Sequence, residues 1–168
     1  MDEYEFVVDA MLGDLAKWLR ILGKSTYYDP NALDDTLVEV AERNGAVLVT
    51  RDRELYEKAS KRGVEVIYLA ELRLAEALQL IGARYGVRLS VDFSDTRCPL
   101  CNGKLRRASC NEVEGKVPLG VLERRKPVFI CVSCGHVYWP GSHLKRMKAF
   151  LRKLWSGGNA FSVPHSRA

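Results

Sequence analysis

Four of the five cysteines stand in two Cys-x-x-Cys pairs, Cys98 with Cys101 and Cys131 with Cys134. Zinc prefers four thiolate or imidazole ligands in a tetrahedron, and two cysteines separated by two residues supply two corners from one tight turn. In a chain whose first residues lack the pattern of an export signal, such pairs indicate metal binding more readily than disulfides. Because four thiolates leave no position open for a substrate, we expect the zinc ion to stabilise the fold and not to act in catalysis.

Two redox-active dithiols are the competing interpretation, but a motif of that kind usually opens a helix in a thioredoxin-like unit. His136 and His143 are further candidate ligands, although four thiolates already suffice. Gly103 and Gly135 follow the two pairs, where the turn of a zinc ribbon commonly needs a positive φ. The fifth cysteine, Cys110, is expected to be a small apolar side chain or an unpaired thiol in a loop.

A second group of candidate residues consists of aspartates near the ends of predicted strands. Asp9 closes the apolar run at residues 5–8, and Asp52 lies shortly after the run at residues 46–49. In an open parallel sheet, ligands bind outside the carboxyl ends of the strands. Carboxylates gathered there repel one another unless a hard divalent cation neutralises them, so we predict a Mg²⁺ or Mn²⁺ site and phosphate chemistry. The further candidates at this edge are Asp29, Asp34 and Asp35.

Most of these acids also have a purely structural explanation. Asp34 and Asp52 stand where helices begin and are favourable N-cap residues, and Asp29 precedes Pro30 in a turn sequence. Asp9 follows a buried run with no turn to require it. It is therefore the strongest single candidate for a functional carboxylate.

The spacing of apolar residues in the first half of the chain predicts strands alternating with helices. Strands are predicted at residues 5–8, 25–28, 46–49 and 65–69, and helices at residues 10–22, 34–44, 53–62 and 71–85. This alternation predicts an α/β domain with a parallel sheet and helices on its faces.

The composition changes near residues 92–95, after which Cys, Pro, Gly and β-forming residues dominate up to about residue 141. A basic amphipathic segment follows at residues 144–155, and the last dozen residues read as a flexible tail. We therefore predict an α/β domain at residues 1–92, a small β-rich zinc ribbon at 93–143, and a basic helix with a tail at 144–168.

The net charge of +5 is unevenly distributed along the chain. Residues 1–92 hold 12 Lys and Arg against 17 Asp and Glu, net −5, whereas residues 93–168 hold 14 against 4, net +10. A surface this basic attracts polyanions, so RNA or DNA is the expected partner, and a merely solvated face is the alternative. Without a long apolar run or an export signal, the sequence predicts a soluble cytoplasmic protein that does not associate with membranes.

Both halves of the chain resemble one known family, the PIN-like ribonucleases named after the C-terminal domain of the exonuclease Mut-seven. In that family a PIN-type domain is followed by a zinc ribbon. The resemblance covers about residues 5–148 and is carried by three stretches, FVVDAMLGDLAKWLRILG at 6–23, DDTLVEVAERNGAVLVTRDREL at 34–55 and CVSCGHVYWPGSH at 131–143. Because PIN-type domains frequently pair, the resemblance also implies a homodimer.

The resemblance implies a metal-dependent ribonuclease, most simply an endonuclease, in which Asp9, Asp34 and Asp52 bind the catalytic Mg²⁺ or Mn²⁺. Thr50, in the Thr-Arg-Asp sequence, would help to orient this site. Asp35 is the alternative to Asp34 as the middle acid.

The chain departs from the family at three positions. Lys24 and Ser25 stand where the family often has an aromatic residue and an aspartate, and Asp14 stands where it often has Lys or Arg. Asp29 is the acid that would compensate for the missing one.

RNA is expected to lie against the basic ribbon and the helix that follows it, because single strands are gripped by aromatic faces beside cations. The predicted RNA contacts are Lys17, Arg20, Arg51, Tyr138, Trp139, His143, Lys145 and Arg146. The aromatic residues have an alternative role as the packed end of the ribbon, with His143 capping the next helix. The alternative to an enzyme is a non-catalytic protein with vestigial acids whose ribbon docks on RNA or a ribosomal particle.

Overall fold

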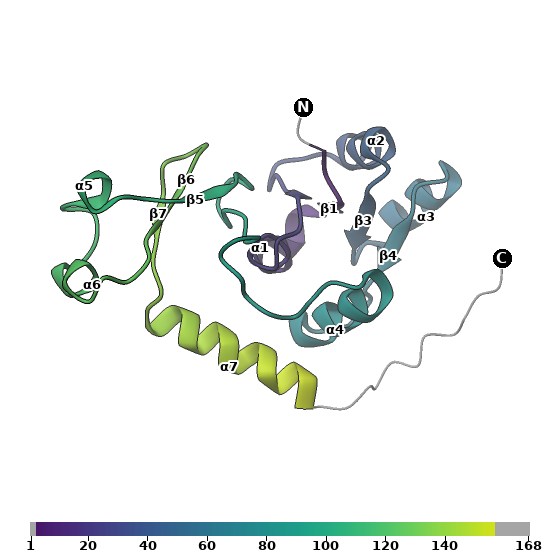
Figure 1. Ribbon diagram of the computed structural model, residues 1–168. Helices are drawn as coiled ribbons and strands as arrows, with labels where there is room; N and C mark the ends of the chain where they lie inside the picture. Colours follow the sequence, from purple (N-terminus) through teal and green to yellow (C-terminus); the bar gives the residue numbers. More distant parts are fainter. Residues whose placement is uncertain (1–2, 157–168) are drawn as a thin grey trace.

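The computed structural model describes residues 3–156 and contains two β-sheets and a long C-terminal helix (Figure 1). The first sheet is parallel, with strand order β2-β1-β3-β4. Its strands are β1 (Phe6–Val8), β2 (Thr26–Tyr27), β3 (Val47–Thr50) and β4 (Val66–Tyr68). Its helices are the 3₁₀ turn η1 (Ala10–Leu12), α1 (Gly13–Ile21), α2 (Asp34–Asn44), α3 (Arg53–Lys61) and α4 (Leu74–Tyr85). This arrangement confirms the predicted α/β class.

Helices cover both faces of the first sheet because successive strand residues point to opposite sides. Phe6 and Val8 belong to the apolar cluster formed with α1 and α4, whereas Val7 belongs to the cluster formed with α2 and α3. Each helix that follows a strand runs back along the sheet, so α1, α2 and α3 all begin at the carboxyl edge of the strands. Residues at these helix starts therefore meet residues at the strand ends.

The second sheet is antiparallel and consists of β5 (Leu105–Arg107), β6 (Phe129–Cys131) and β7 (Val137–Tyr138). Two short helices, α5 (Cys110–Val113) and α6 (Leu119–Glu123), lie in the connection between β5 and β6. They were not predicted, and they are held by a small core of four buried valines, Val113, Val117, Val121 and Val128. The predicted β-rich module is therefore present, with an added helical cap.

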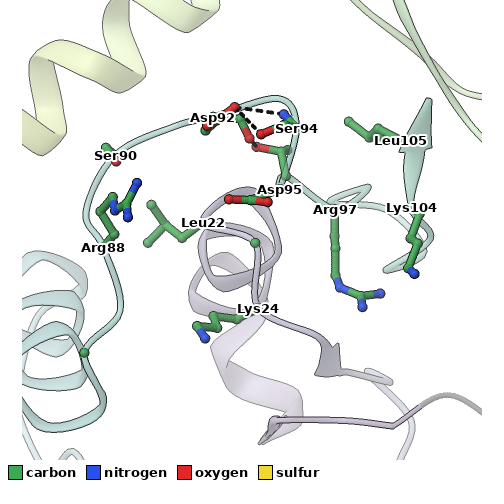
Figure 2. A pocket seen from close by; sticks show the side chains of 13 residues that line it. Leu22, Lys24, Arg88, Ser90, Asp92, Ser94, Asp95, Arg97, Lys104 and Leu105 are labelled. Atoms are coloured by element: carbon green, nitrogen blue, oxygen red, sulfur yellow. Dashed lines mark hydrogen bonds between the residues drawn. The ribbon is translucent and has the colours of Figure 1, made fainter. Parts of the chain in front are cut away.

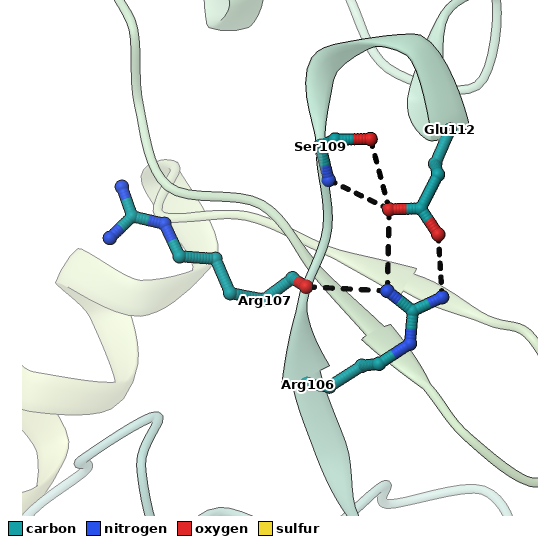
Figure 3. Close-up of polar contacts among 4 residues, drawn as sticks. All are labelled: Arg106, Arg107, Ser109 and Glu112. Atoms are coloured by element: carbon teal, nitrogen blue, oxygen red, sulfur yellow. Dashed lines mark hydrogen bonds and ion pairs between the residues drawn. The ribbon is translucent and has the colours of Figure 1, made fainter.

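An ion pair closes the start of α5 (Figure 3). The guanidinium of Arg106 donates to both carboxylate oxygens of Glu112, which also accepts from the backbone N–H and hydroxyl of Ser109. The Arg106 hydrogen bond, followed by those from Ser109, lowers the pKa of Glu112 to about 2. Because all these groups are exposed or half-exposed, the pair orients the turn and adds little stability.

The helix α7 (Ser142–Ser156) returns from the ribbon to the first domain (Figure 1). Leu151 and Leu154 are buried in the cluster that contains α1 and α4, and the rings of Trp18 and Phe150 lie 5.1 Å apart between centroids. The predicted basic helix is confirmed, although it starts two residues earlier than expected. The predicted tail falls mostly on residues 157–168, which lie outside the described part. Between residues 3 and 156, no helix has the length and apolar character needed to cross a membrane.

Candidate active site and metal centre

The four cysteines of the two pairs come together between the ribbon and the linker that precedes it. Their sulfur atoms all lie within 4.8 Å of one another, with Cys98 and Cys134 at 3.7 Å and Cys101 and Cys131 at 3.4 Å. A tetrahedral zinc ion with bonds of about 2.3 Å to sulfur places its ligands about 3.8 Å apart. The four thiols therefore fit a structural zinc ion, and neither His136 nor His143 belongs to the group.

The predicted role of glycine in the two turns is correct for one pair and wrong for the other. Gly135 has a φ of +74°, as expected. After the first pair, the residue with positive φ is Asn102, at +69°. Gly103 is needed for a different reason, because a β-carbon there would lie 2.7 Å from the sulfur of Cys131. The sequence pattern located the tight turn but not which residue adopts the left-handed conformation.

The first cysteine turn docks on the edge strand β2 of the parallel sheet. Asn102 accepts a hydrogen bond from the backbone N–H of Thr26 at 2.8 Å and donates one to the hydroxyl of Ser25. Arg20, on α1, donates to the carbonyl oxygens of Thr26 and Pro99 at 3.0–3.1 Å. These contacts cross the predicted boundary at residue 92 and cover an edge that would otherwise expose unpaired backbone groups.

Arg20 therefore does not have the location expected of an RNA contact. Its side chain lies in the interior, with 5% of the residue exposed, and burial lowers its pKa although nearby cysteines and tyrosines oppose the shift. Its guanidinium donors are directed to backbone carbonyls between the two domains. The physical reason is that an arginine can satisfy several carbonyls at once, and so links two segments 79 residues apart.

Arg20→Leu should lower the free energy of unfolding by about 2–4 kcal/mol, because the buried carbonyl of Thr26 and the partly buried carbonyl of Pro99 lose this donor. Chemical denaturation measures this loss, and Arg88→Leu, at an exposed arginine, is the matched control. Equal stability of the two variants would contradict the linking role of Arg20.

The acid site is organised around Thr50, the last residue of β3. Val8 and Val49 are register partners in β1 and β3, so Asp9 and Thr50 lie side by side at the carboxyl edge. The Thr50 hydroxyl donates to Oδ2 of Asp9 at 2.6 Å and accepts from the backbone N–H of Asp52 at 2.8 Å. Through these two hydrogen bonds, Thr50 links two of the three predicted acids.

Asp9 is 9% exposed, yet one of its oxygens remains available. Oδ2 accepts from the Thr50 hydroxyl, whereas Oδ1 has no hydrogen-bond partner among the described residues. In this part of the chain, every fully buried side-chain oxygen has a partner, so Oδ1 is not fully buried. Oδ1 is therefore accessible from outside the protein. Asp9 presents one oxygen outward while the other is held in place.

Three of the other four acids have carboxylates that are engaged by hydrogen bonds or an ion pair. Asp52 caps α3 through Oδ1, which accepts from the backbone N–H groups of Glu54 and Leu55, so its capping explanation is correct. Asp29 accepts from the backbone N–H of Asn31, as its turn explanation requires. Asp35 pairs with Lys58, an interaction that lowers the pKa of this carboxyl.

The capping explanation for Asp34 is wrong, because Leu33 occupies the N-cap position of α2 and Asp34 is the first helical residue. Asp34 is exposed and makes no ion pair or side-chain hydrogen bond within residues 3–156. Between the two neighbouring acids, Asp34 is thus the one whose carboxylate is available.

The three predicted metal ligands share one edge of the sheet but are not gathered into a closed cage. Over residues 3–156, the cysteines form the one group of three or more potential ligands that lie close enough together to hold an ion. Asp9, Asp34 and Asp52 each keep at least one oxygen without a partner in this range. Their donor chemistry suits a hard cation, whereas their spacing leaves the ligand set incomplete.

The sequence from residue 4 to residue 151 matches the family model of the Mut7-C RNase domain. The chain belongs to this family. A shorter segment is similar to Ribonuclease VapC9 of Archaeoglobus fulgidus, with 50% identity over 38 residues, which cover 23% of this chain and 28% of that protein. No solved structure matches the chain.

Two predicted RNA contacts of this Mut7-C RNase domain line a cleft beside the acid edge. The cleft has a volume of about 460 Å³ and is bounded by η1, the start of α1 and the ends of β3 and β4. Lys17 and Arg51 contribute to its lining, and both are exposed. Arg51 is steadied by a 2.7 Å hydrogen bond to the carbonyl of Leu72. We refer to this hollow as the acid-edge cleft.

A different cavity, of about 540 Å³, lies at the opposite end of α1, between the linker and β5 (Figure 2). Its charged lining is mixed, comprising Lys24, Arg88, Arg97, Lys104, Asp92 and Asp95. The carboxylate of Asp92 is engaged by the backbone N–H and hydroxyl of Ser94. Because α1 separates this cavity from the strand ends, it has no part in the acid site.

The remaining predicted RNA contacts lie at the ribbon and on α7. Tyr138, Trp139 and His143 line an apolar cavity, whereas Lys145 and Arg146 are exposed on the first two turns of α7. The hydroxyl of Tyr138 lies 3.0 Å from the sulfur of Cys98, which gives this residue a packing role beside the zinc centre.

Proposed function

We propose that this protein is a divalent-metal-dependent endoribonuclease that cleaves single-stranded RNA at the carboxyl edge of its parallel sheet. The observation that carries the proposal is the largely buried carboxylate of Asp9, held by the Thr50 hydroxyl with its other oxygen accessible. Membership of the Mut7-C RNase family and the similarity to Ribonuclease VapC9 support the same reaction class.

Asp9, Asp34 and Asp52 are the residues that would hold Mg²⁺ or Mn²⁺. When bound, such a cation would neutralise charge that develops on the phosphate during cleavage. Asp34 and Asp52 are exposed at the starts of α2 and α3. The Asp34 carboxylate has no partner within residues 3–156, whereas Asp52 caps α3 through Oδ1 and keeps Oδ2 for a cation. Thr50 acts as a positioning residue, because it fixes the rotamer of Asp9 and the backbone that leads to Asp52.

Lys17 and Arg51 are proposed to position the RNA at the acid site. Both line the acid-edge cleft, and a cation beside each phosphate offsets the repulsion between the RNA and the aspartates. The Leu72 carbonyl holds the Arg51 guanidinium at the cleft. The net charge of +10 over residues 93–168 supplies the long-range attraction for the rest of the strand.

The competing function is RNA or ribosome binding without cleavage. It is favoured by one observation, the engagement of Asp52 as a helix cap in an acid set that is not closed. It requires the same basic surfaces, so binding measurements alone do not separate the two functions.

Labelled single-stranded RNA of mixed sequence, incubated with zinc-loaded protein, is expected to be cut when Mg²⁺ or Mn²⁺ is added and to stay intact without either ion. Gel electrophoresis reads the products, and a DNA strand of the same sequence is the control for substrate class. Intact RNA at every concentration of both ions would favour the non-catalytic function.

A further inference from the structure

We propose that the apolar cavity between the linker, the ribbon and α7 binds one unpaired nucleobase of the RNA. This inference rests on the proposed function, because it concerns how the same RNA is held. The cavity has a volume of about 450 Å³. Its main lining side chains are Phe93, Tyr138, Trp139, His143, Leu144 and Met147. We call it the base pocket.

The lining of the base pocket combines aromatic faces with unused polar groups. No Asp, Glu, Lys or Arg lines it. The indole N–H of Trp139, the hydroxyl of Ser142 and the imidazole of His143 make no hydrogen bond within residues 3–156. A flat heterocycle needs this combination, since it stacks on aromatic rings and presents donors and acceptors along its edge.

The charge around the base pocket favours a nucleic acid over an uncharged apolar ligand. The sequence holds no Asp or Glu after Glu123. Lys145, Arg146 and Lys148 lie on α7, within six residues of His143 and Ser142 in the pocket wall. A base seated in the pocket carries its phosphates on the outside, where these cations neutralise them.

The helix α1 connects the base pocket with the acid-edge cleft. Lys17 lines the cleft, and Ile21, one helical turn later, lines the pocket. Gly13 also lines the cleft, and it lies eight residues, or about 12 Å along the helix axis, from Ile21. A fully stacked strand rises about 3.4 Å per nucleotide and an unpaired strand is more extended, so at most about four nucleotides cover that length. The held base therefore sets the distance along the RNA at which Asp9 meets a phosphate.

The test compares two pocket variants with a control in an Asp9→Asn background, which prevents cleavage during the measurement. Trp139→Leu removes the aromatic face but keeps apolar packing, and His143→Ala removes an exposed edge group. Trp155→Ala is the matched control, because Trp155 is 75% exposed at the far end of α7. Fluorescence anisotropy with an eight-nucleotide RNA measures affinity.

Trp139→Leu is expected to weaken RNA binding by about tenfold, the loss of one stacked base, and His143→Ala by about fivefold, the loss of one hydrogen bond to the base edge, while Trp155→Ala leaves binding unchanged. An abasic strand of the same length should bind all four proteins equally, because only its phosphates are read. The zinc content of Trp139→Leu shows whether its ribbon is folded. If that variant has lost zinc, His143→Ala alone tests the pocket. The proposal would be overturned if His143→Ala bound the RNA as tightly as its parent, or if the pocket variants lost as much affinity for the abasic strand as for the normal strand.

Failure of the pocket and failure of the nuclease proposal are distinguishable. Loss of affinity in the pocket variants, together with no metal-dependent cleavage by the parent protein, supports the pocket and removes the enzyme. Metal-dependent cleavage together with unchanged affinity in the pocket variants supports the enzyme and removes the pocket.

Discussion

Asp9→Asn is expected to lower the rate of RNA cleavage by about 10³-fold, the effect of losing several kcal/mol of charge stabilisation at the metal site. The substitution retains the size of the side chain and the oxygen that accepts from Thr50, and removes the negative charge. Affinity for RNA should stay the same or rise slightly, because one charge that repels phosphate is gone.

The control for this prediction is Asp29→Asn, which changes an acid that serves in a turn after β2. Both proteins are compared in single-turnover cleavage and in anisotropy measurements. Equal cleavage by Asp9→Asn and the parent protein would remove the enzyme hypothesis. An equal loss in Asp29→Asn would instead make Asp29 part of the site.

Cys131→Ser is expected to release the zinc ion and to unfold the ribbon. Cys131 is 2% exposed at the end of β6, and its sulfur accepts from the backbone N–H of Cys134. Zinc binding contributes about 10–16 kcal/mol in small structural sites, far more than the four-valine core of this ribbon can replace. Elemental analysis of the parent protein should give about one zinc per chain.

The loss of zinc should also reach the first domain, because Asn102 and the Pro99 carbonyl are held in the turn that carries the first two zinc ligands. Limited proteolysis should therefore cut near β2 as well as in the ribbon. Cys110→Ser is the control, since Cys110 is exposed and lies outside the cysteine group. A zinc-free parent protein, or wild-type protease resistance of Cys131→Ser, would contradict the metal centre.

The parallel sheet and the cysteine group could be predicted because their signals are local. The alternation of apolar positions in residues 5–85 reflects the period of each helix and strand, and the cysteine spacing reflects one tight turn at a time. The helices α5 and α6 are four and five residues long, too short to show a period, and the local signal for α5 is the capping box formed by Ser109 and Glu112. The packing of Val113, Val117, Val121 and Val128 holds both helices.

The state of Arg20 depended on neighbours that are far away in the chain, and the state of Asp34 depended on the residue at which α2 begins. The sequence predicts Arg20 to be a surface cation, but its side chain is buried and donates to carbonyls up to 80 residues away. Asp34 reads as a cap, but the N-cap position falls one residue earlier and leaves its carboxylate free.

By itself, the sequence determined the α/β class and the cysteine group, and it singled out Asp9, because residue spacing and strand ends are properties of short segments. Thr50 was indicated by the family resemblance. The tertiary structure decided that Thr50 holds Asp9, that the zinc turn covers β2, and that aromatic residues of the ribbon form a pocket with α7. These features need surfaces from separate segments to meet, and the free energy of burial that brings them together is a property of the whole fold.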